Sequence, residues 1–234
     1  MTKNRSLAKP VALVTGASRG IGRSTALRLS RDHDIIDIAR TAADLESLKS
    51  EIEKGGSTCR TIALDLADHD ATDRALVGVE CDVLINNAGV GPVKPFLSLT
   101  RQEWHSIVDV NFNALFHVTR AVLPGMVKRR HGHIVIVGSI AGRSAFVGGT
   151  AYGASKHAVA GFAECLMLEV REHGVKVSTV NPGSVATAFS ERADDSWMLS
   201  PDEVADSIAH VIATPADVLV HSLEIRALMP PKKG

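Results

Sequence analysis

The chain has 234 residues, of which 45% are hydrophobic, so it is long enough for one α/β domain with a substantial core. Its 26 basic and 26 acidic side chains cancel, which excludes the charge signature of a nucleic-acid or membrane-surface protein. Its three cysteines, Cys59, Cys81 and Cys165, have neither disulfide-framework nor metal-site spacing, and no apolar run is long enough to span a bilayer. We therefore expect a single cytoplasmic domain over residues 1–234, without a metal, nucleic-acid or membrane partner.

Apolar runs and helical patterns alternate along the chain. The apolar runs predict strands at residues 10–14, 35–39, 58–64, 82–85, 134–137, 175–180 and 218–226. Helical periodicity or N-capping signals lie between them, at residues 23–31, 42–54, 68–79, 100–130, 152–172 and from 200 onwards. This alternation predicts a doubly wound α/β fold, in which helices cover both faces of a parallel sheet.

A glycine-rich turn follows the first predicted strand and precedes the first predicted helix. Its pattern is T-G-x-x-x-G-x-G, at residues 15–22. Unpaired N–H groups and the helix dipole at such a helix N-terminus favour a phosphate, and glycines let the backbone approach the ligand. The alternative is a turn that binds nothing. We predict a nucleotide-binding turn, and its candidate contacts are Gly16, Ser18, Arg19, Gly20, Ile21 and Gly22.

The end of the second predicted strand carries conflicting signals about the cofactor. Arg40 follows this strand and Arg19 lies in the glycine turn, so two guanidinium groups could flank the 2′-phosphate of NADP. Asp37, on the same strand, is about where an acidic residue binds the ribose of NAD. The alternative is that Arg40 and Asp37 are ordinary solvated charges. We favour NADP and keep NAD as possible.

Two further strand ends carry candidate cofactor contacts. Asp65 and Leu66 end the third strand, where the carboxylate either meets the adenine amino group or caps a turn. Asn87, Ala88 and Gly89 follow the fourth strand. A cofactor can lie against such small and amide residues, although they also suit a tight turn.

Tyr152 and Lys156 are four residues apart in a predicted helix, so their side chains share one face. A free phenol has a pKa of about 10, and a positive charge roughly 5 Å away favours its ionised form. We therefore expect the pKa of Tyr152 to be lowered toward neutrality, as a general acid–base catalyst requires. A surface contact between the two side chains is the alternative.

Three other features complete the candidate site. Ser139 follows the fifth strand, at the edge where open parallel sheets bind ligands. Asn111 lies inside a helical pattern, where it either bends the helix or holds a catalytic water. Residues 183–200 include Phe189, Trp197 and Met198, which predict a lid over a partly apolar substrate unless they pack onto the core.

Together these motifs resemble the short-chain dehydrogenase/reductase family, and the match covers nearly the whole chain. The matching motifs are the glycine turn at residues 15–22, N-N-A-G at 86–89, Asn111, Ser139, Y-x-x-x-K at 152–156 and N-P-G at 181–183. The resemblance implies a Rossmann-like parallel sheet with strand order 3-2-1-4-5-6-7. It also implies a homodimer or homotetramer built through the two long helices that carry Asn111 and Tyr152.

The resemblance further implies a role for each site residue. Tyr152 is the acid–base catalyst, Lys156 lowers its pKa and binds the nicotinamide ribose, Ser139 holds the substrate oxygen, and Asn111 organises a water for proton relay. Four positions around and after the N-P-G motif match the cofactor-binding segment of relatives: Pro182, Gly183, Val185 and Thr187.

One segment departs from the family pattern. Many relatives that resemble 3-oxoacyl-carrier-protein reductase have a T-G-x-x-x-x-V-D-G-G-like segment near the C-terminus. Residues 220–226 here read V-H-S-L-E-I-R, which weakens the inference of a 3-oxoacyl substrate and of a tetramer.

We therefore predict an NADP-preferring oxidoreductase. It transfers hydride between NADP(H) and a carbonyl or secondary alcohol group of a small, partly apolar substrate. The alternatives are a non-catalytic NADP-responsive binding protein on the same fold, a reductase of the 3-oxoacyl type, and an enzyme of another nicotinamide-dependent reaction such as epimerisation.

Overall fold

The structure is a computed structural model that describes residues 9–187 and 196–229. The strands within these residues are β1 Val11–Thr15, β2 Asp34–Ala39, β3 Cys59–Ala63, β4 Val83–Asn86, β5 Gly132–Val137, β6 Val175–Pro182 and β7 Ser222–Ile225. The α-helices are α1 Gly20–Leu29, α2 Ala42–Lys54, α3 His69–Ala75, α4 Arg101–Val108, α5 Ala114–Arg129, α6 Thr150–Val170 and α7 Pro201–Ile212. A π-helix, η2 Asp109–Asn113, joins α4 to α5, and short 3₁₀ helices lie at η1 Phe96–Ser98, η3 Ile140–Gly142 and η4 Arg171–His173.

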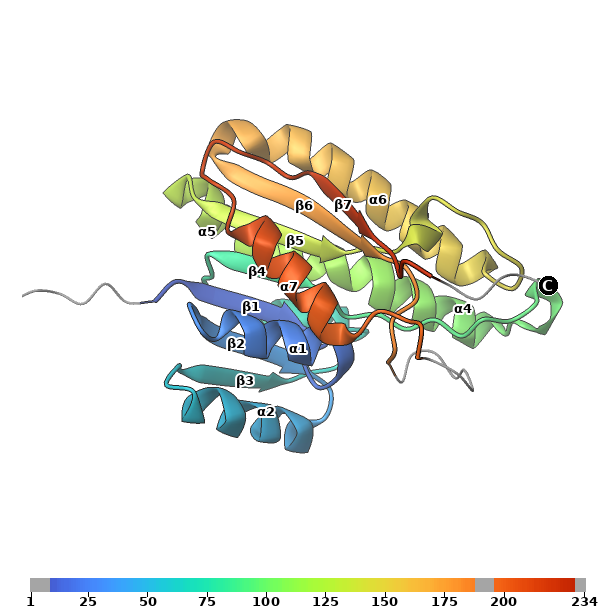
Figure 1. The fold of residues 1–234 in the computed structure, drawn as a ribbon, viewed down its shortest axis with the longest axis horizontal. Helices are drawn as coiled ribbons and strands as arrows, with labels where there is room; N and C mark the ends of the chain where they lie inside the picture. Colours follow the sequence, from blue (N-terminus) through green and yellow to red (C-terminus); the bar gives the residue numbers. More distant parts are fainter. Residues whose placement is uncertain (1–8, 188–195, 230–234) are drawn as a thin grey trace, which may run out of the picture.

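The strands form one parallel sheet in the order β3-β2-β1-β4-β5-β6-β7, which confirms the predicted fold class. Because every strand runs in the same direction, all carboxyl ends lie at one edge of the sheet, at the arrowheads in Figure 1. The order reverses direction between β1 and β4, which is where open α/β sheets bind nucleotides. The sheet therefore positions the loops after β1, β4, β5 and β6 next to one another.

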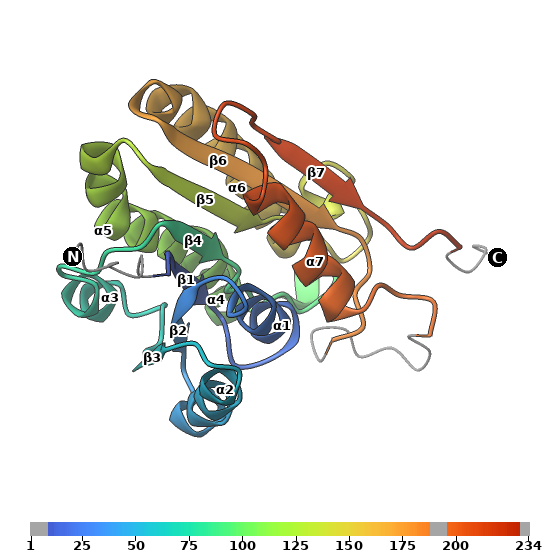
Figure 2. The ribbon, with the colours of Figure 1, turned by 60° about the vertical axis from the view of Figure 1, so that its left-hand side comes forward.

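Helices cover both faces of the sheet (Figures 1 and 2). α1, α2 and α7 pack on one face, around a core that includes Val14, Leu48 and Ile208. α3, α5 and α6 pack on the other face, around a core that includes Leu13 and Met126. Leu13 and Val14 are adjacent in β1 and fully buried on opposite faces, which explains the continuous apolar run of this strand.

Two predicted boundaries are wrong for local reasons. α3 ends at Ala75 instead of residue 79, because the chain turns at Gly78, which has a positive φ of 72°. β7 covers only Ser222–Ile225 of the predicted 218–226, since its pairing with β6 begins where Ser222 meets Thr179.

The predicted helix over residues 100–130 is divided by the π-helix. Its start is confirmed, because Thr100 and Glu103 form a capping box at α4. Asn111 lies in the middle of the π-helix, where an extra residue is inserted into the turn.

Candidate functional site

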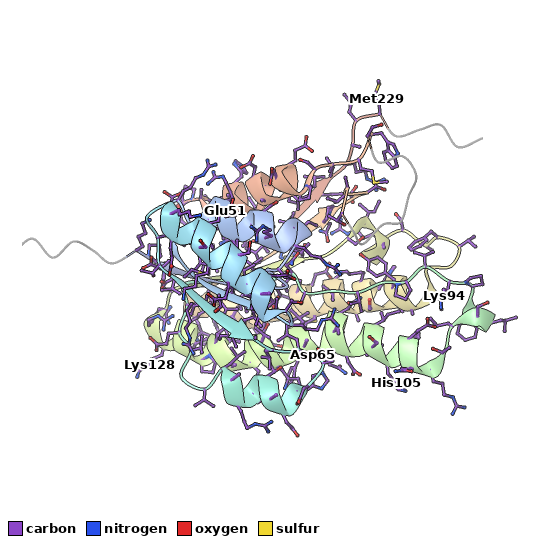
Figure 3. All side chains as sticks on the ribbon, turned by 90° about the horizontal axis from the view of Figure 1, so that it is seen from below. Glu51, Asp65, Lys94, His105, Lys128 and Met229 are labelled. Carbon is purple, nitrogen blue, oxygen red and sulfur yellow. The ribbon has the colours of Figure 1, made fainter. Side chains whose placement is uncertain are left out.

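The predicted site residues gather at the carboxyl edge of the sheet. Gly16 follows β1, Asn87 follows β4, Ser139 follows β5 and Gly183 follows β6. In Figure 3 this edge faces the end of the molecule where Lys94 and Met229 lie, whereas Lys128 marks the opposite end.

The glycine turn packs too closely for any side chain at two of its positions. A Cβ atom added to Gly22 would lie 2.2 Å from the carbonyl oxygen of Gly16. Gly16 has a φ of +67°, and a Cβ there would lie 2.9 Å from Cα of Ala88. These glycines therefore let the turn after β1 pack directly on the loop after β4.

Thr15 fastens these two loops together, and sequence reasoning did not single it out as a site residue. Its hydroxyl oxygen accepts hydrogen bonds from the backbone N–H groups of Asn87 at 2.9 Å and Ala88 at 3.1 Å, and it donates to the carbonyl of Ile85 at 3.2 Å. The Asn87 amide returns a bond to the Thr15 carbonyl at 2.9 Å. The position of Thr15, at the start of the T-G-x-x-x-G-x-G pattern, is the sequence feature from which this role could have been predicted.

The start of α1 fits a phosphate group. Arg19 occupies the N-cap position, and its side chain makes no capping hydrogen bond. The first N–H groups of the helix therefore keep their capacity to bind an anion. Thr187, after β6, reaches back over this turn, since its Cγ2 lies 3.2 Å from where a Cβ of Gly20 would be. A dinucleotide pyrophosphate fits this arrangement.

Two arginines border the same region. Arg19 and Arg40 are exposed, and neither side chain makes a hydrogen bond or ion pair with another residue that the structure describes. Two such guanidinium groups suit an additional phosphate.

Asp37 does not compete with these arginines, which corrects the NAD-type alternative. Its side chain is 0% exposed and packs beneath α1 and α2, so it cannot reach a ribose at the surface. Strand alternation explains this position, because Ile36 and Ile38 face the opposite core.

The surroundings of Asp37 are unusual for a carboxylic acid. Cys59 donates a weak hydrogen bond to Oδ2 at 3.5 Å, and Oδ1 has no hydrogen-bond partner among the residues that the structure describes. Burial raises the pKa of Asp37 to about 7, against smaller opposing effects of Cys59 and Arg23.

Asp65 caps a turn. Its Oδ1 accepts a hydrogen bond from the backbone N–H of Ala67 at 3.0 Å, and the carboxylate is exposed after β3. Leu66 beside it is buried. An adenine contact for Asp65 and Leu66 stays a prediction.

Ser139, Tyr152 and Lys156 lie together. The Tyr152 phenol and the Ser139 hydroxyl are hydrogen-bonded, and Ser139 also accepts a bond from the backbone N–H of Ala141 at 3.1 Å. The ammonium of Lys156 lies 5.8 Å from the centre of the Tyr152 ring and donates to the carbonyl of Val137 at 2.9 Å. The spacing of Tyr152 and Lys156 therefore did predict their proximity.

The expected lowering of the Tyr152 pKa is wrong for this structure. Burial raises the pKa of the phenol, and the hydrogen bond with Ser139 opposes that rise only in part. Burial also lowers the pKa of Lys156 to about 8. Four-residue helical spacing puts the ammonium over the ring rather than at the hydroxyl, and desolvation disfavours the charged form of both groups.

Asn111 is tied to two segments by its side chain. Its Oδ1 accepts from the backbone N–H of Val90 at 2.7 Å, and its Nδ2 donates to the Val90 carbonyl at 2.8 Å and to the Ser155 hydroxyl at 3.0 Å. Neither Val90 nor Ser155 was predicted, because only the folded chain brings them to the π-helix.

The predicted lid is described at its two ends. Ala186 donates to the carbonyl of Leu199 at 2.8 Å, and Leu199 donates to the carbonyl of Ser184 at 3.0 Å, so the ends of the loop meet. Trp197 and Met198 are half-buried, and Phe189 lies outside the described residues.

The described residues contain neither a metal-type cluster of side chains nor a membrane-spanning helix. Over 9–187 and 196–229 there is no group of three or more His, Cys, Asp or Glu side chains placed to hold a metal ion. In the same part of the chain no helix is both long and apolar enough to cross a membrane.

Comparison with known proteins places the chain in a family. The family model described as short chain dehydrogenase matches residues 10–196. The chain therefore belongs to the short-chain dehydrogenase/reductase family and is an oxidoreductase of that family, as its motifs predicted.

Individual relatives are similar over most of their length. The chain is 33% identical to the NADP-dependent 3-hydroxy acid dehydrogenase of Escherichia coli K12, over 92% of this chain and 94% of that protein. It is 35% identical to the 3-oxoacyl-(acyl-carrier-protein) reductase of Vibrio harveyi, over 79% and 77%. A solved structure of the closed form of serine dehydrogenase complexed with NADP+ superimposes with a TM-score of 0.89, at 31% identity, over 96% of this chain and 97% of that one.

Proposed function

We propose that this protein is an NADP-dependent dehydrogenase/reductase that interconverts a carbonyl and a hydroxyl group of a small, partly apolar substrate. The observation that carries the proposal is the hydrogen bond between Tyr152 and Ser139 beside the buried Lys156, at the carboxyl edge of the sheet. Relatives named for NADP and for hydroxy-acid or serine substrates support the same chemistry.

Each residue of the site has a defined task in this proposal. Ser139 and Tyr152 bind the substrate oxygen, on which negative charge develops during reduction. Tyr152 gives a proton to that oxygen, or removes it in the reverse direction. Lys156 provides positive charge beside the phenol, and Asn111 organises a water that relays protons.

The cofactor is held by the residues after β1, β2, β4 and β6. The N–H groups of the glycine turn bind the pyrophosphate, and Arg19 and Arg40 bind the 2′-phosphate. Pro182, Gly183, Val185 and Thr187 border the nicotinamide. When bound, NADP supplies or accepts the hydride.

The wider arrangement of the protein belongs to the same proposal. Residues 183–200 close over the substrate as a lid, and the chain works in the cytoplasm as a single domain that forms a homodimer or homotetramer. Phe116 on α5 and Leu168 on α6 support the assembly, because they are 48% and 56% exposed on the two long helices. Light scattering on the purified protein measures the assembly directly.

Paired kinetics test the proposed reaction. NADPH and NADH are each offered with ketones, aldehydes and diones, and NADP+ with 3-hydroxy acids and serine. We expect turnover with NADPH and a kcat/KM at least tenfold lower with NADH, because the guanidinium groups of Arg19 and Arg40 can bind a 2′-phosphate that NADH lacks. NADPH binding without turnover of any compound would instead favour a binding protein.

Arg40 gives the matched variant for cofactor choice. Arg40→Ala should weaken NADPH binding about tenfold and leave NADH binding nearly unchanged, since one charge-assisted phosphate contact is lost. Arg74→Ala, an exposed arginine in the last turn of α3, is the control that should change neither dissociation constant. Equal losses for the two cofactors would contradict the role of Arg40.

A further inference from the structure

Ser155 occupies a special position on the catalytic helix. It lies on α6 between Tyr152 and Lys156 and is only 4% exposed. A buried hydroxyl needs hydrogen-bond partners, because a buried polar group without a partner destabilises the fold. The identity of its partners therefore indicates what the serine holds.

Both hydrogen bonds of the Ser155 hydroxyl lead to the active site. It donates to the backbone carbonyl of Tyr152 at 2.7 Å, three residues earlier in the same helix. It accepts from Nδ2 of Asn111 at 3.0 Å, across the contact between α6 and the π-helix. One hydroxyl thus joins the turn that carries the phenol to a residue of a different element.

Asn111 continues the connection to the loop after β4. Its amide makes three hydrogen bonds, two to the backbone of Val90 and one to Ser155, so both N–H groups and the oxygen are used. The reversed amide would set a donor against the Val90 N–H, so the network fixes its orientation. Asn111 is 4% exposed, so water cannot readily replace a lost partner.

The π-helix explains why these groups meet. An inserted residue rotates the side chains after it relative to an ordinary helix and often marks a functional position. Asn111 sits at the centre of η2 Asp109–Asn113, facing α6 and the loop beyond Gly89. A Cβ on Gly89 would approach its Oδ1 to 3.4 Å, so the loop passes close by.

We propose that Ser155 is a positioning residue of the reaction, which locks the Tyr152 turn of α6 to the Asn111 π-helix and, through Asn111, to the loop after β4. The three segments then keep one arrangement, and the half-buried phenol stays against Ser139. Catalysis depends on such positioning, because a small displacement of a reacting group lowers the rate strongly.

The chain offers a direct probe of this idea that needs no substrate. Tyr152 is its only tyrosine, so ultraviolet absorption of tyrosinate against pH reports the ionisation of that phenol alone. In Ser155→Ala the turn is released, and burial of the phenol decreases. Since burial raises the pKa of Tyr152, we expect the midpoint of this titration to fall by half a unit or more in Ser155→Ala.

Matched variants separate positioning from general stability. Ser207→Ala on α7 removes a similar bond, from the hydroxyl to the Glu203 carbonyl at 2.9 Å, away from the site, and should leave the midpoint unchanged. Ser155→Thr keeps a hydroxyl that can bond the Tyr152 carbonyl, so the midpoint of the titration should return to the wild-type value. Ser155→Cys keeps the volume with poorer hydrogen bonding and replaces Ser155→Ala if that variant does not fold. Circular dichroism across the titration confirms that each variant is folded.

A rate measurement completes the test and rests on the proposed function. The rate of 2,3-butanedione reduction, expressed per bound NADPH, should fall about tenfold in Ser155→Ala and recover in Ser155→Thr. A wild-type tyrosine midpoint in folded Ser155→Ala, or in the Ser155→Cys that replaces it, would overturn the proposal, whether or not this dione is a substrate. Failure of the dione with wild-type protein concerns only the proposed function, because the titration still decides the role of Ser155.

Discussion

The Tyr152 hydroxyl is the group on which proton transfer depends. Its half-buried position, its bond with Ser139 and the nearby Lys156 make it the one phenol in the chain that can serve the site. Tyr152→Phe keeps the ring and removes the hydroxyl. We expect kcat to fall about 10²- to 10⁴-fold, as is typical for loss of a general acid, with little change in NADPH affinity. Steady-state kinetics and a fluorescence titration with NADPH measure the two quantities.

The outcome that contradicts this role is near-normal turnover by Tyr152→Phe. The melting temperature serves as a control, since the conservative change should shift it only slightly. A large fall in NADPH affinity would also conflict with the assignment, because it would make Tyr152 mainly a cofactor contact.

At the residue scale the sequence predicts proximity better than electrostatics. The four-residue spacing of Tyr152 and Lys156 placed them together without any knowledge of the fold. The direction of the Tyr152 pKa shift was wrong, because burial of both groups depends on elements distant in the chain. The burial of Asp37 was missed for the same reason, because the sequence does not distinguish a solvated aspartate at a strand end from a buried one.

At the scale of elements, the glycine turn and α1 form the most constrained connection. A methyl group at position 22 would lie 2.2 Å from the carbonyl oxygen of Gly16, so the turn must open to admit it. We expect Gly22→Ala to weaken NADPH binding at least tenfold, because the N–H groups that hold the phosphate move with the turn. Isothermal titration calorimetry measures the affinity.

Gly161 provides the matched control for this change. It lies on α6, and a Cβ there meets nothing within 4 Å. Gly161→Ala should leave NADPH affinity unchanged, because the added methyl group displaces no atom of the chain. Equal affinities for wild-type protein and Gly22→Ala would mean that the turn does not hold the cofactor.

Elements with local signals could be predicted, whereas those that tertiary contacts create could not. The Ser200 and Glu203 capping box marked the start of α7, and Asp68 marked that of α3. The π-helix around Asn111 had no comparable signal, because its hydrogen bonds to Val90 and Ser155 exist only after the loops have assembled.

At the scale of the whole molecule, the core around α1, α2 and α7 contains two titratable side chains with opposite effects on stability. His133 in β5 is buried and bonded to Ser178 at 2.8 Å, and burial lowers its pKa to about 4. A histidine with a lowered pKa stabilises the fold above its unfolded pKa of about 6.5, and this contribution is lost as the pH falls from there toward 4.

Asp37 acts in the opposite sense in nearly the same pH range. Burial raises its pKa from 3.8 to about 7, so its contribution is complete below pH 3.8 and is lost as the pH rises toward 7. Each of these shifts corresponds to roughly 3–4 kcal/mol at full effect. Between pH 4 and 6.5 the two contributions therefore change in opposite directions as the pH rises.

Single substitutions should separate the two opposing pH dependences of the free energy of unfolding. Asp37→Asn removes the acid and keeps its shape, so the free energy of unfolding should rise with pH between 4 and 6.5, as the His133 contribution alone dictates. His133→Gln keeps a hydrogen-bonding side chain beside Ser178, and stability should then fall with rising pH as Asp37 ionises. Urea unfolding at half-unit steps of pH measures the free energy of unfolding of all three proteins. Their other titratable groups are the same, so differences between the curves come from the substituted residue. Parallel curves for the three would mean that neither buried group titrates differently in the folded and unfolded chain. Opposite slopes would establish that this face of the sheet balances one buried acid against one buried base.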